Sequence, residues 1–441
     1  MVLTEYLPNY LTVKAIHPKT PIKFESKTNP KNGITIPQLI DKFVPEFQNG
    51  ASNLLSPFLV NGHLQTAYAS VRSFKGIDQV TYKRLVLNYK CGGEGTVDFA
   101  VKDILPDELP HQPQFQKNLP SDTHYTFFPP DDARLTSDDS KPMLIVLHGL
   151  AGGSSESYVR SLVHCITHVY NFEACVLNAR GCCQSSITTP QLYNGGWTND
   201  IRYFIKQLRE MYPNRKFYMV GYSLGASVLT NYLGEEGDKS DISCSITVSV
   251  PWDLERSAYF INGTKMGQIF YSPALCKSLM NLTNSHLDEL HNDERFQTIY
   301  TANVNRIKTL QQFDDCFTGP LFNYKDGMSY YKDASSYQRL PLIRTPLLAL
   351  NALDDPITGA DSLPEKQIEE NPYTMMIETD IGGHVAWFEN SSGKRWYTEP
   401  ICKFLSSFHD EIASKDLKLV VDKDKLPTSD RPYVMTTYRD E

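Results

Sequence analysis

The sequence predicts an α/β fold, in which a mostly parallel sheet carries helices on both faces and a helical lid is inserted. From residue 142 onward, β-rich runs alternate with helix-like segments, an order typical of parallel sheets. This alternation is interrupted over residues 254–344, where helical segments rich in Tyr, Phe and Met follow one another without a strand. A third observation is a short apolar run that leads through Gly-Tyr-Ser-Leu-Gly into a helix-like run at residues 217–233.

The first part of the chain precedes this alternation. Residues 1–75 show little periodic pattern, and we expect them to form an N-terminal extension. Two β-rich runs within residues 79–104 flank Gly92 and Gly93 and predict a β-hairpin. Residues 106–141 are rich in Pro, Asp and Ser and predict a mobile surface insertion.

The alternating region predicts the body of the fold. We expect strands at residues 142–149, 174–180, 217–220 and 244–250, further strands within the runs 345–356 and 373–387, and helices at 157–169, 199–212, 226–233 and 397–414. The predicted α/β core therefore comprises residues 76–253 and 345–415, with the lid at 254–344 between its two parts. The charged residues 416–441 predict a loosely held C-terminal tail.

Composition limits the classes of partner and cofactor. The formal charge of −8 argues against nucleic acid, which favours a basic surface. No apolar run approaches the length of about 18 residues that a transmembrane helix needs, and the first residues do not resemble a secretory signal. We therefore expect a cytoplasmic location, with peripheral association with membranes or lipid droplets as an open alternative; the oligomeric state is left open. Nine irregularly spaced cysteines without a C-x-x-C pair predict free thiols, no metal site and no cofactor.

Ser223, in the Gly-Tyr-Ser-Leu-Gly stretch, is the candidate nucleophile. A serine between a strand and a helix, within G-x-S-x-G, is typical of a strained turn that exposes the hydroxyl. Gly221 and Gly225 would leave room where the helix crosses close to the strand. Because a serine hydroxyl is a weak nucleophile at neutral pH, it needs a base and a carboxylate that orients the base.

The candidate base is His384. Where a nucleophilic serine lies on such a turn, the acid and then the histidine follow it along the chain. After Ser223, His286 and His291 fall in the predicted lid and His409 falls inside the last predicted helix. His384 instead follows a predicted strand and two glycines, in a loop able to reach back over the sheet.

The candidate acid is Asp355. The strand within residues 345–356 ends in Asp354 and Asp355, at the sheet edge where ligands gather in such folds. Asp355 directly precedes Pro356-Ile357, which favours it as the orienting acid, and Asp354 remains the alternative.

Two backbone N–H groups are expected to stabilise the developing oxyanion. One belongs to Leu224, directly after the nucleophile, and the other to Leu150, directly after the strand that ends at His148-Gly149. The glycines after this strand match neither common phosphate-loop pattern, so an oxyanion role is favoured over phosphate binding.

Several motifs occur together in a familiar order: GHLQT at 62–66, HGLAGGS at 148–154, the segment 178–202, GYSLGA at 221–226, DDP at 354–356 and GGH at 382–384. Over roughly residues 35–415 the chain resembles the α/β-hydrolase family that includes the fungal medium-chain fatty acid ethyl ester synthase/esterases. Within this family it most resembles the fungal monoacylglycerol lipase-like branch. The family's catalytic triad falls on Ser223, Asp355 and His384.

The resemblance implies cleavage of fatty acyl esters, monoacylglycerols among them, and in relatives acyl transfer from acyl-CoA to an alcohol. Two departures are visible: Cys91 stands before Gly92-Gly93 where relatives commonly have Asp, and an H-x-x-x-x-D acyltransferase motif is absent. We therefore favour a serine ester hydrolase that acts on lipid esters. An acyl-CoA:alcohol O-acyltransferase is the alternative, and a non-catalytic binding protein with the same fold is a third interpretation.

Overall fold

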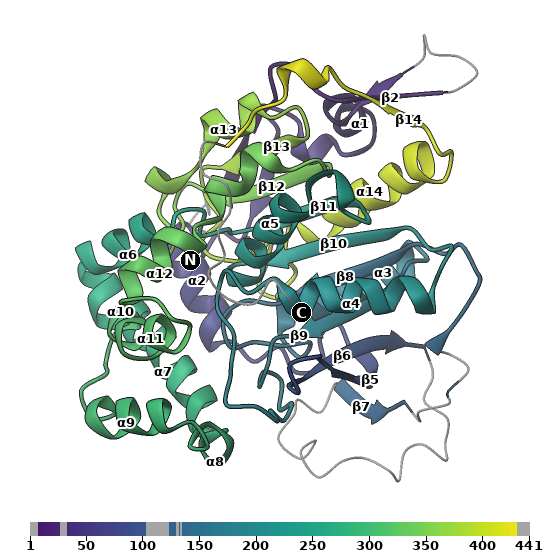
Figure 1. Cartoon of the computed structure of the whole chain (residues 1–441). Coiled ribbons are helices and arrows are strands. Elements are labelled where there is room, and N and C mark those ends of the chain that lie inside the picture. Colours follow the sequence, from purple (N-terminus) through teal and green to yellow (C-terminus); the bar gives the residue numbers. More distant parts are fainter. Residues whose placement is uncertain (1–7, 27–32, 103–122, 129–131, 133–134, 430–441) are drawn as a thin grey trace.

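One large sheet forms the centre of the molecule (Figure 1). The computed structural model describes residues 8–26, 33–102, 123–128, 132 and 135–429. Within these ranges, 11 strands pair in the order β4-β1-β13-β12-β11-β10-β8-β9-β6-β5-β7. In chain order they are β1 (Asn9–Ile16), β4 (Ser52–Leu55), β5 (Val80–Asn88), β6 (Glu94–Val101), β7 (Thr123–Phe127), β8 (Met143–Leu147), β9 (Glu173–Asn178), β10 (Phe217–Tyr222), β11 (Ile242–Val248), β12 (Leu347–Ala352) and β13 (Thr374–Thr379).

The central six strands, β9-β8-β10-β11-β12-β13, pair in parallel throughout. Every residue of β8 and β10 is buried, as expected for strands that are covered on both faces. Side chains of β8 alternate between two apolar clusters, with Leu144 and Val146 in one and Met143, Ile145 and Leu147 in the other. The predicted mostly parallel α/β fold is confirmed.

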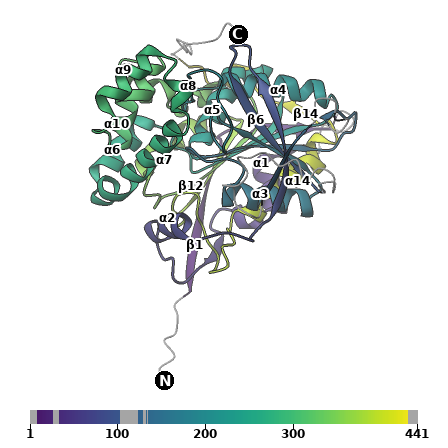
Figure 2. The same ribbon diagram turned by 90° about the horizontal axis from the view of Figure 1, so that it is seen from below.

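Helices cover both faces of this sheet (Figure 2). On one face lie α1 (Ile36–Phe43), α3 (Ser157–Val169) and α14 (Thr398–Phe408). On the other lie α4 (Asn199–Met211), α5 (Leu224–Glu236) and α13 (Glu365–Glu370). The helices α1, α3, α4 and α14 each bury an apolar stripe against the sheet, whereas α5 is buried on all sides from Gly225 to Gly234.

The N-terminal segment is more closely integrated than the sequence analysis predicted. We expected residues 1–75 to be an extension, but β1 pairs with β13 and with β4 inside the main sheet. Its residues alternate, with Leu11 and Val13 buried and Thr12 and Lys14 exposed, as in a strand with one covered face. The segment also contributes α2 (Gly62–Val71), which lies beside the candidate site.

The predicted hairpin is confirmed: β5 and β6 pair antiparallel, with Asn88 opposite Glu94. Most of the predicted surface insertion at 106–141 lies outside the described residues, and its strand β7 pairs with β5 at the edge of the sheet. In the predicted tail, β14 (Lys418–Val420) pairs with β2 (Lys23–Glu25), which pairs with β3 (Ile34–Thr35); residues 430–441 lie outside the described part.

A helical insertion separates β11 from β12, and its helices lie together to one side of the sheet in both views (Figures 1 and 2). It has an apolar core of its own, in which Leu279, Phe313 and Phe317 are buried. Its helices are α6 (Leu254–Gly263), α7 (Ser272–Asn284), α8 (Leu287–Leu290), α9 (Glu294–Asn303), α10 (Leu310–Phe313), α11 (Gly319–Leu321) and α12 (Gly327–Ala334), with π-helical turns at Gly267–Tyr271 and Asp314–Thr318.

A buried carboxyl group joins two parts of this insertion. Asp314 accepts hydrogen bonds from the hydroxyl of Thr318, one turn later, and from the hydroxyl of Tyr331 in α12. Burial raises the pKa of Asp314 to about 6, although both hydrogen bonds act in the opposite direction. At pH 7 the insertion therefore contains a carboxylate that is costly to keep ionised.

This carboxylate predicts how stability depends on pH. The folded-state pKa of Asp314 lies above the unfolded-state value. Its contribution to the free energy of unfolding is therefore most favourable below pH 4 and is lost as the pH rises through about 6. Two pKa units correspond to about 3 kcal/mol. We expect Asp314→Asn, relative to the wild type, to gain up to about that much unfolding free energy between pH 4 and pH 8. Urea unfolding of both proteins across this range measures the difference, and parallel stability curves would contradict it.

Candidate active site

Ser223 lies in a strained turn between β10 and α5. Its backbone φ of 50° is in the left-handed region that non-glycine residues rarely adopt, and its N–H donates to the Val248 carbonyl at 2.9 Å. The two neighbouring glycines permit the tight crossing. A Cβ on Gly225 would lie 2.3 Å from the carbonyl oxygen of His148, and one on Gly221 would lie 2.7 Å from the Cα of Ala226.

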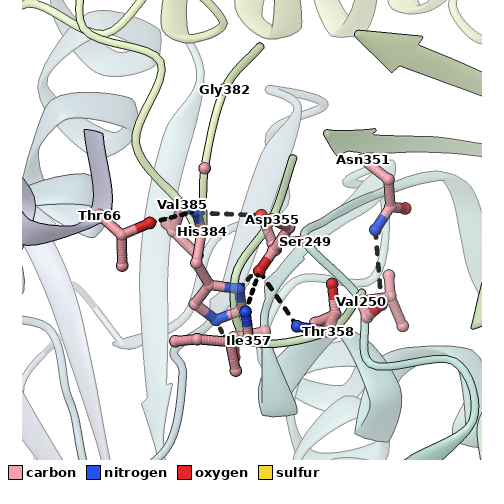
Figure 3. Close-up of polar contacts among 12 residues, drawn as sticks. Thr66, Ser249, Val250, Asn351, Asp355, Ile357, Thr358, Gly382, His384 and Val385 are labelled. Carbon is pink, nitrogen blue, oxygen red and sulfur yellow. Dashed lines mark hydrogen bonds and ion pairs between the residues drawn. The ribbon is translucent and has the colours of Figure 1, made fainter. Parts of the chain in front are cut away.

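His384 and Asp355 extend from Ser223 as a line of hydrogen bonds. His384 Nε2 lies 2.8 Å from Ser223 Oγ, and His384 Nδ1 lies 2.8 Å from Asp355 Oδ2. The other Asp355 oxygen accepts from the N–H groups of Ile357 at 2.8 Å and Thr358 at 3.1 Å. Burial alone would raise the pKa of Asp355, but His384 and these hydrogen bonds outweigh it and lower that pKa. Figure 3 shows His384 between Thr66 and Asp355.

Asp354, the alternative acid, has a different set of partners. Its Oδ1 accepts from the N–H groups of Gly382 at 2.8 Å and Gly383 at 2.9 Å. It therefore binds the backbone of the loop that precedes His384, whereas Asp355 contacts the His384 ring. The structure brings the ring to Asp355, the residue preferred from the sequence.

Two further side chains hold the histidine loop, and sequence reasoning assigned neither a role. Thr66 Oγ1 accepts from the His384 N–H at 2.9 Å, and Ser249 Oγ accepts from the Val385 N–H at 3.0 Å. Val385 has a φ of 53°, so the chain turns sharply directly after the histidine. Thr66 is the last residue of the GHLQT motif, and this motif was the available sequence signal. Ser249 had no such signal, because it fell inside the strand predicted at residues 244–250.

The loop after β8 lies directly beside the serine. A Cβ on Gly149 would lie 3.4 Å from the Cβ of Ser223. The N–H of Gly149 donates to the Tyr158 hydroxyl at 2.9 Å and that of Ala151 donates to the Tyr193 hydroxyl at 2.7 Å. These bonds flank Leu150, which lines the same cavity as Ser223.

Leu224, the other candidate oxyanion donor, begins α5. Its N–H is among the first four of the helix and so has no partner within it. Leu224 also lines the cavity at Ser223. The structure thus brings Leu150, Leu224 and Ser223 to one cavity.

A buried polar network anchors the far end of the β8 loop. Both oxygens of Asp98 accept from the guanidinium of Arg84, at 2.6 and 2.7 Å. One of these oxygens also accepts from the Ser154 hydroxyl at 2.6 Å and from the Asn178 amide at 2.8 Å. The loop is thereby tied to the β5–β6 hairpin and to β9, contacts that join residues far apart in the sequence.

His148, at the start of this loop, has a structural role. It is buried, and its Nε2 accepts from the Ala179 N–H at 3.0 Å, so its Nδ1 carries the proton and donates to the Gly149 carbonyl at 2.7 Å. Burial lowers the pKa of His148 to about 4, so the ring is neutral at pH 7.

A cavity of about 110 Å³ lies over the serine, between the sheet edge and the helical insertion. Its polar lining includes Ser223, His384 and Asp314. The apolar lining comes from both sides: Leu150, Leu224, Leu254, Ala258, Ile261, Leu275, Leu279, Leu310 and Ile357. The arrangement places the Ser223 hydroxyl and the His384 imidazole at the floor of a mainly apolar chamber, with the Asp355 carboxylate behind the imidazole.

The described residues contain no group of three or more His, Cys, Asp or Glu side chains that could hold a metal ion. No helix within the described ranges is long and apolar enough to cross a membrane.

Comparison with known proteins agrees with the motifs. Residues 142–391 match the family described as alpha/beta hydrolase fold. The chain is 54% identical over 453 residues to the monoacylglycerol lipase of Saccharomyces cerevisiae, covering 100% of both chains. It is 33% identical over 425 residues to medium-chain fatty acid ethyl ester synthase/esterase 2 of the same yeast, covering 89% of this chain and 93% of the relative.

Among solved structures, the esterase Pf2001 of Pyrococcus furiosus matches with 12% identity and a TM-score of 0.44, covering 76% of this chain and 93% of that chain. The family match and the full-length relative confirm the resemblance noted from the motifs. This chain belongs to the α/β-hydrolase family, in the group of the yeast monoacylglycerol lipase and the medium-chain fatty acid ethyl ester synthase/esterases.

Proposed function

We propose that this protein is a serine ester hydrolase that cleaves fatty acyl esters, with monoacylglycerols and medium-chain fatty acid esters as its substrates. The observation that carries the proposal is the line of hydrogen bonds from Asp355 through His384 to Ser223 at the floor of an apolar cavity. The full-length similarity to a yeast monoacylglycerol lipase supports the substrate class.

In the first half-reaction, Ser223 Oγ attacks the ester carbonyl carbon while His384 Nε2 takes the hydroxyl proton. Asp355 keeps the proton on His384 Nδ1 and stabilises the imidazolium that forms. The N–H groups of Leu150 and Leu224 donate to the oxyanion of the tetrahedral intermediate. When the intermediate collapses, His384 returns the proton to the leaving alcohol, and the acyl group remains on Ser223.

In the second half-reaction, water attacks the acyl carbon and gives a proton to His384. His384 then donates that proton to Ser223 Oγ as the bond between Oγ and the acyl carbon breaks. This step restores the serine hydroxyl and releases the fatty acid. Neither half-reaction uses a metal or cofactor.

The helical insertion, residues 254–344, is proposed to act as the lid that forms the acyl-binding pocket. It supplies Leu254, Ala258, Ile261, Leu275, Leu279 and Leu310 to the wall of the cavity above the serine. Each methylene of an acyl chain buried there gains about 0.8 kcal/mol, so an apolar wall favours longer chains until the pocket is full.

We further propose a cytoplasmic protein that binds peripherally to a membrane or lipid-droplet surface. Large apolar side chains are exposed both in the segment that leads into α2, at Phe58, and in the insertion, at Ile269 and Phe270. The two segments meet where His63 Nδ1 lies 2.8 Å from the Tyr271 hydroxyl. Exposed apolar groups on two adjoining segments fit contact with a lipid surface.

Acyl transfer from acyl-CoA to an alcohol is a second candidate, favoured by the similarity to the medium-chain ethyl ester synthase/esterase. Both reactions share the acyl-enzyme and differ in whether water or an alcohol accepts the acyl group. Product analysis with a labelled acyl donor, with and without added ethanol, separates them: hydrolysis alone predicts labelled fatty acid in both samples and no labelled ethyl ester.

We expect replacement of the proposed nucleophile to cause the largest loss of catalytic activity. Ser223→Ala removes the atom that forms the acyl-enzyme, and kcat for a monoacylglycerol should fall by about 10⁴- to 10⁶-fold. A fluorophosphonate probe, which reacts with activated serines, should label the wild type and leave this variant unlabelled. Labelling of the variant at the wild-type level would disprove the assignment.

The two adjacent aspartates should respond differently to substitution. Asp355→Asn would hold the imidazole in the wrong tautomer, and we expect kcat to fall by about 10⁴-fold. Asp354→Asn keeps an oxygen that accepts from Gly382 and Gly383 and should cost far less. Steady-state kinetics of both variants with the same ester make the comparison, and equal or reversed losses would show that Asp354 is the orienting acid.

A further inference from the structure

A second cavity, of about 60 Å³, lies between the helical insertion and the loop at residues 190–193, in addition to the one over Ser223. On the side of the insertion it borders the apolar core, where Leu290, Phe296, Phe313 and Phe317 line it and are buried. Protein cores are normally packed without voids of this kind. A cavity walled by phenylalanine and leucine side chains is a suitable environment for hydrocarbon.

Only a thin wall separates this second cavity from the cavity over the serine. Tyr193, Leu279 and Thr318 line both cavities and therefore lie between them. The Tyr193 hydroxyl accepts from the Ala151 N–H at 2.7 Å, and the Thr318 hydroxyl donates to Asp314 at 2.5 Å. These bonds fix two of the three side chains, whereas the side chain of Leu279 has no polar group and is held by packing alone. A change of Leu279 rotamer is therefore the least costly way to join the two cavities.

We propose that the second cavity binds the distal end of a long fatty acyl chain, and that Leu279 sets the chain length at which it becomes occupied. The first carbons of the chain lie in the cavity over Ser223, and only longer chains displace Leu279 and enter the second cavity. This inference rests on the proposed ester hydrolysis at Ser223, and it adds that long-chain acyl groups are accommodated in a separate compartment.

Thr283 offers a way to fill the second cavity without touching the first. It lines the second cavity only, it is buried, and its hydroxyl is among the side-chain atoms of the described residues without a hydrogen-bond partner. Thr283→Leu adds apolar volume inside the cavity and removes that unpaired hydroxyl, so the substitution is compatible with folding. Thr298→Leu is the matched control, because Thr298 is exposed on α9 and lines neither cavity.

The first experiment compares kcat/KM for octanoyl and hexadecanoyl monoacylglycerols. Burial of about two methylenes changes kcat/KM by roughly tenfold. Thr283→Leu should therefore lower the hexadecanoyl-to-octanoyl ratio of kcat/KM by about tenfold or more. Leu279→Ala, which removes the wall residue held by packing alone, should raise that ratio by a similar factor, and Thr298→Leu should leave it at the wild-type value. A folded Thr283→Leu protein with an unchanged ratio, or with equal losses on both chain lengths, would overturn the proposal.

A binding measurement keeps this test separate from the proposed activity. The dissociation constants of octyl and hexadecyl glycerol ethers, which cannot be hydrolysed, are measured by calorimetry in the wild type and in Thr283→Leu. The proposal predicts that the substitution weakens hexadecyl ether binding by about tenfold relative to octyl ether binding. If the wild type hydrolyses no ester and this selective weakening is still seen, the compartment is supported and the proposed function fails. Equal affinities of the two proteins for the hexadecyl ether would refute the compartment.

Discussion

The strained backbone at Ser223 is the constraint on which the rest of the site depends. A positive φ at a non-glycine residue is unfavourable, and it persists here because β10 and α5 are held so close that the chain has no other way to turn. Gly225 makes this possible, since any side chain there would collide with the carbonyl of His148. The same crossing places the N-terminus of α5, and with it the free N–H of Leu224, beside the serine. Packing of one helix against one strand thereby positions both the candidate nucleophile and a candidate oxyanion donor.

The histidine depends on a different set of contacts, which come from three distant parts of the chain. Asp354 binds the glycine turn before His384, Thr66 binds the His384 backbone, and Ser249 binds the residue after it. These three residues bind the backbone of the loop, whereas Asp355 bonds the imidazole ring. Of the two adjacent aspartates after β12, one therefore binds the backbone of the loop and the other bonds the imidazole ring. It also makes the N-terminal segment part of the site, because Thr66 lies on α2.

The features that could be predicted from the sequence are those indicated by patterns within a short stretch of residues. The central strands and helices follow from hydrophobic periodicity, and the turn at Ser223 follows from two glycines at fixed spacing. The order of serine, aspartate and histidine along the chain, together with the positions of Asp355 before Pro356-Ile357 and of His384 after two glycines, selected two residues that the structure places in contact with each other. The catalytic roles of these residues, and of Leu150 and Leu224, are predictions that kinetics can test.

The features that could not be predicted depend on contacts between distant segments. The alternation of Leu11 and Val13 with exposed neighbours is a strand signal, but it is short, and nothing local indicates that β1 would pair with β13 more than 350 residues later. The bonds from Thr66 to His384 and from Asp98 to the β8 loop are likewise formed only after the chain has folded. The two cavities arise where the helices of the insertion pack against loops of the α/β core. Periodicity can predict such helices individually, but it cannot predict how they pack.

The most direct test of this account is to trap the acyl-enzyme. The wild-type protein is mixed with a medium-chain monoacylglycerol, quenched in acid during turnover and digested, and the peptides are analysed by mass spectrometry. If Ser223 is the nucleophile, the peptide containing Ser223 gains the mass of the acyl group and the modification maps to that serine. Turnover accompanied by an acyl group on a different residue, with Ser223 unmodified, would contradict this assignment.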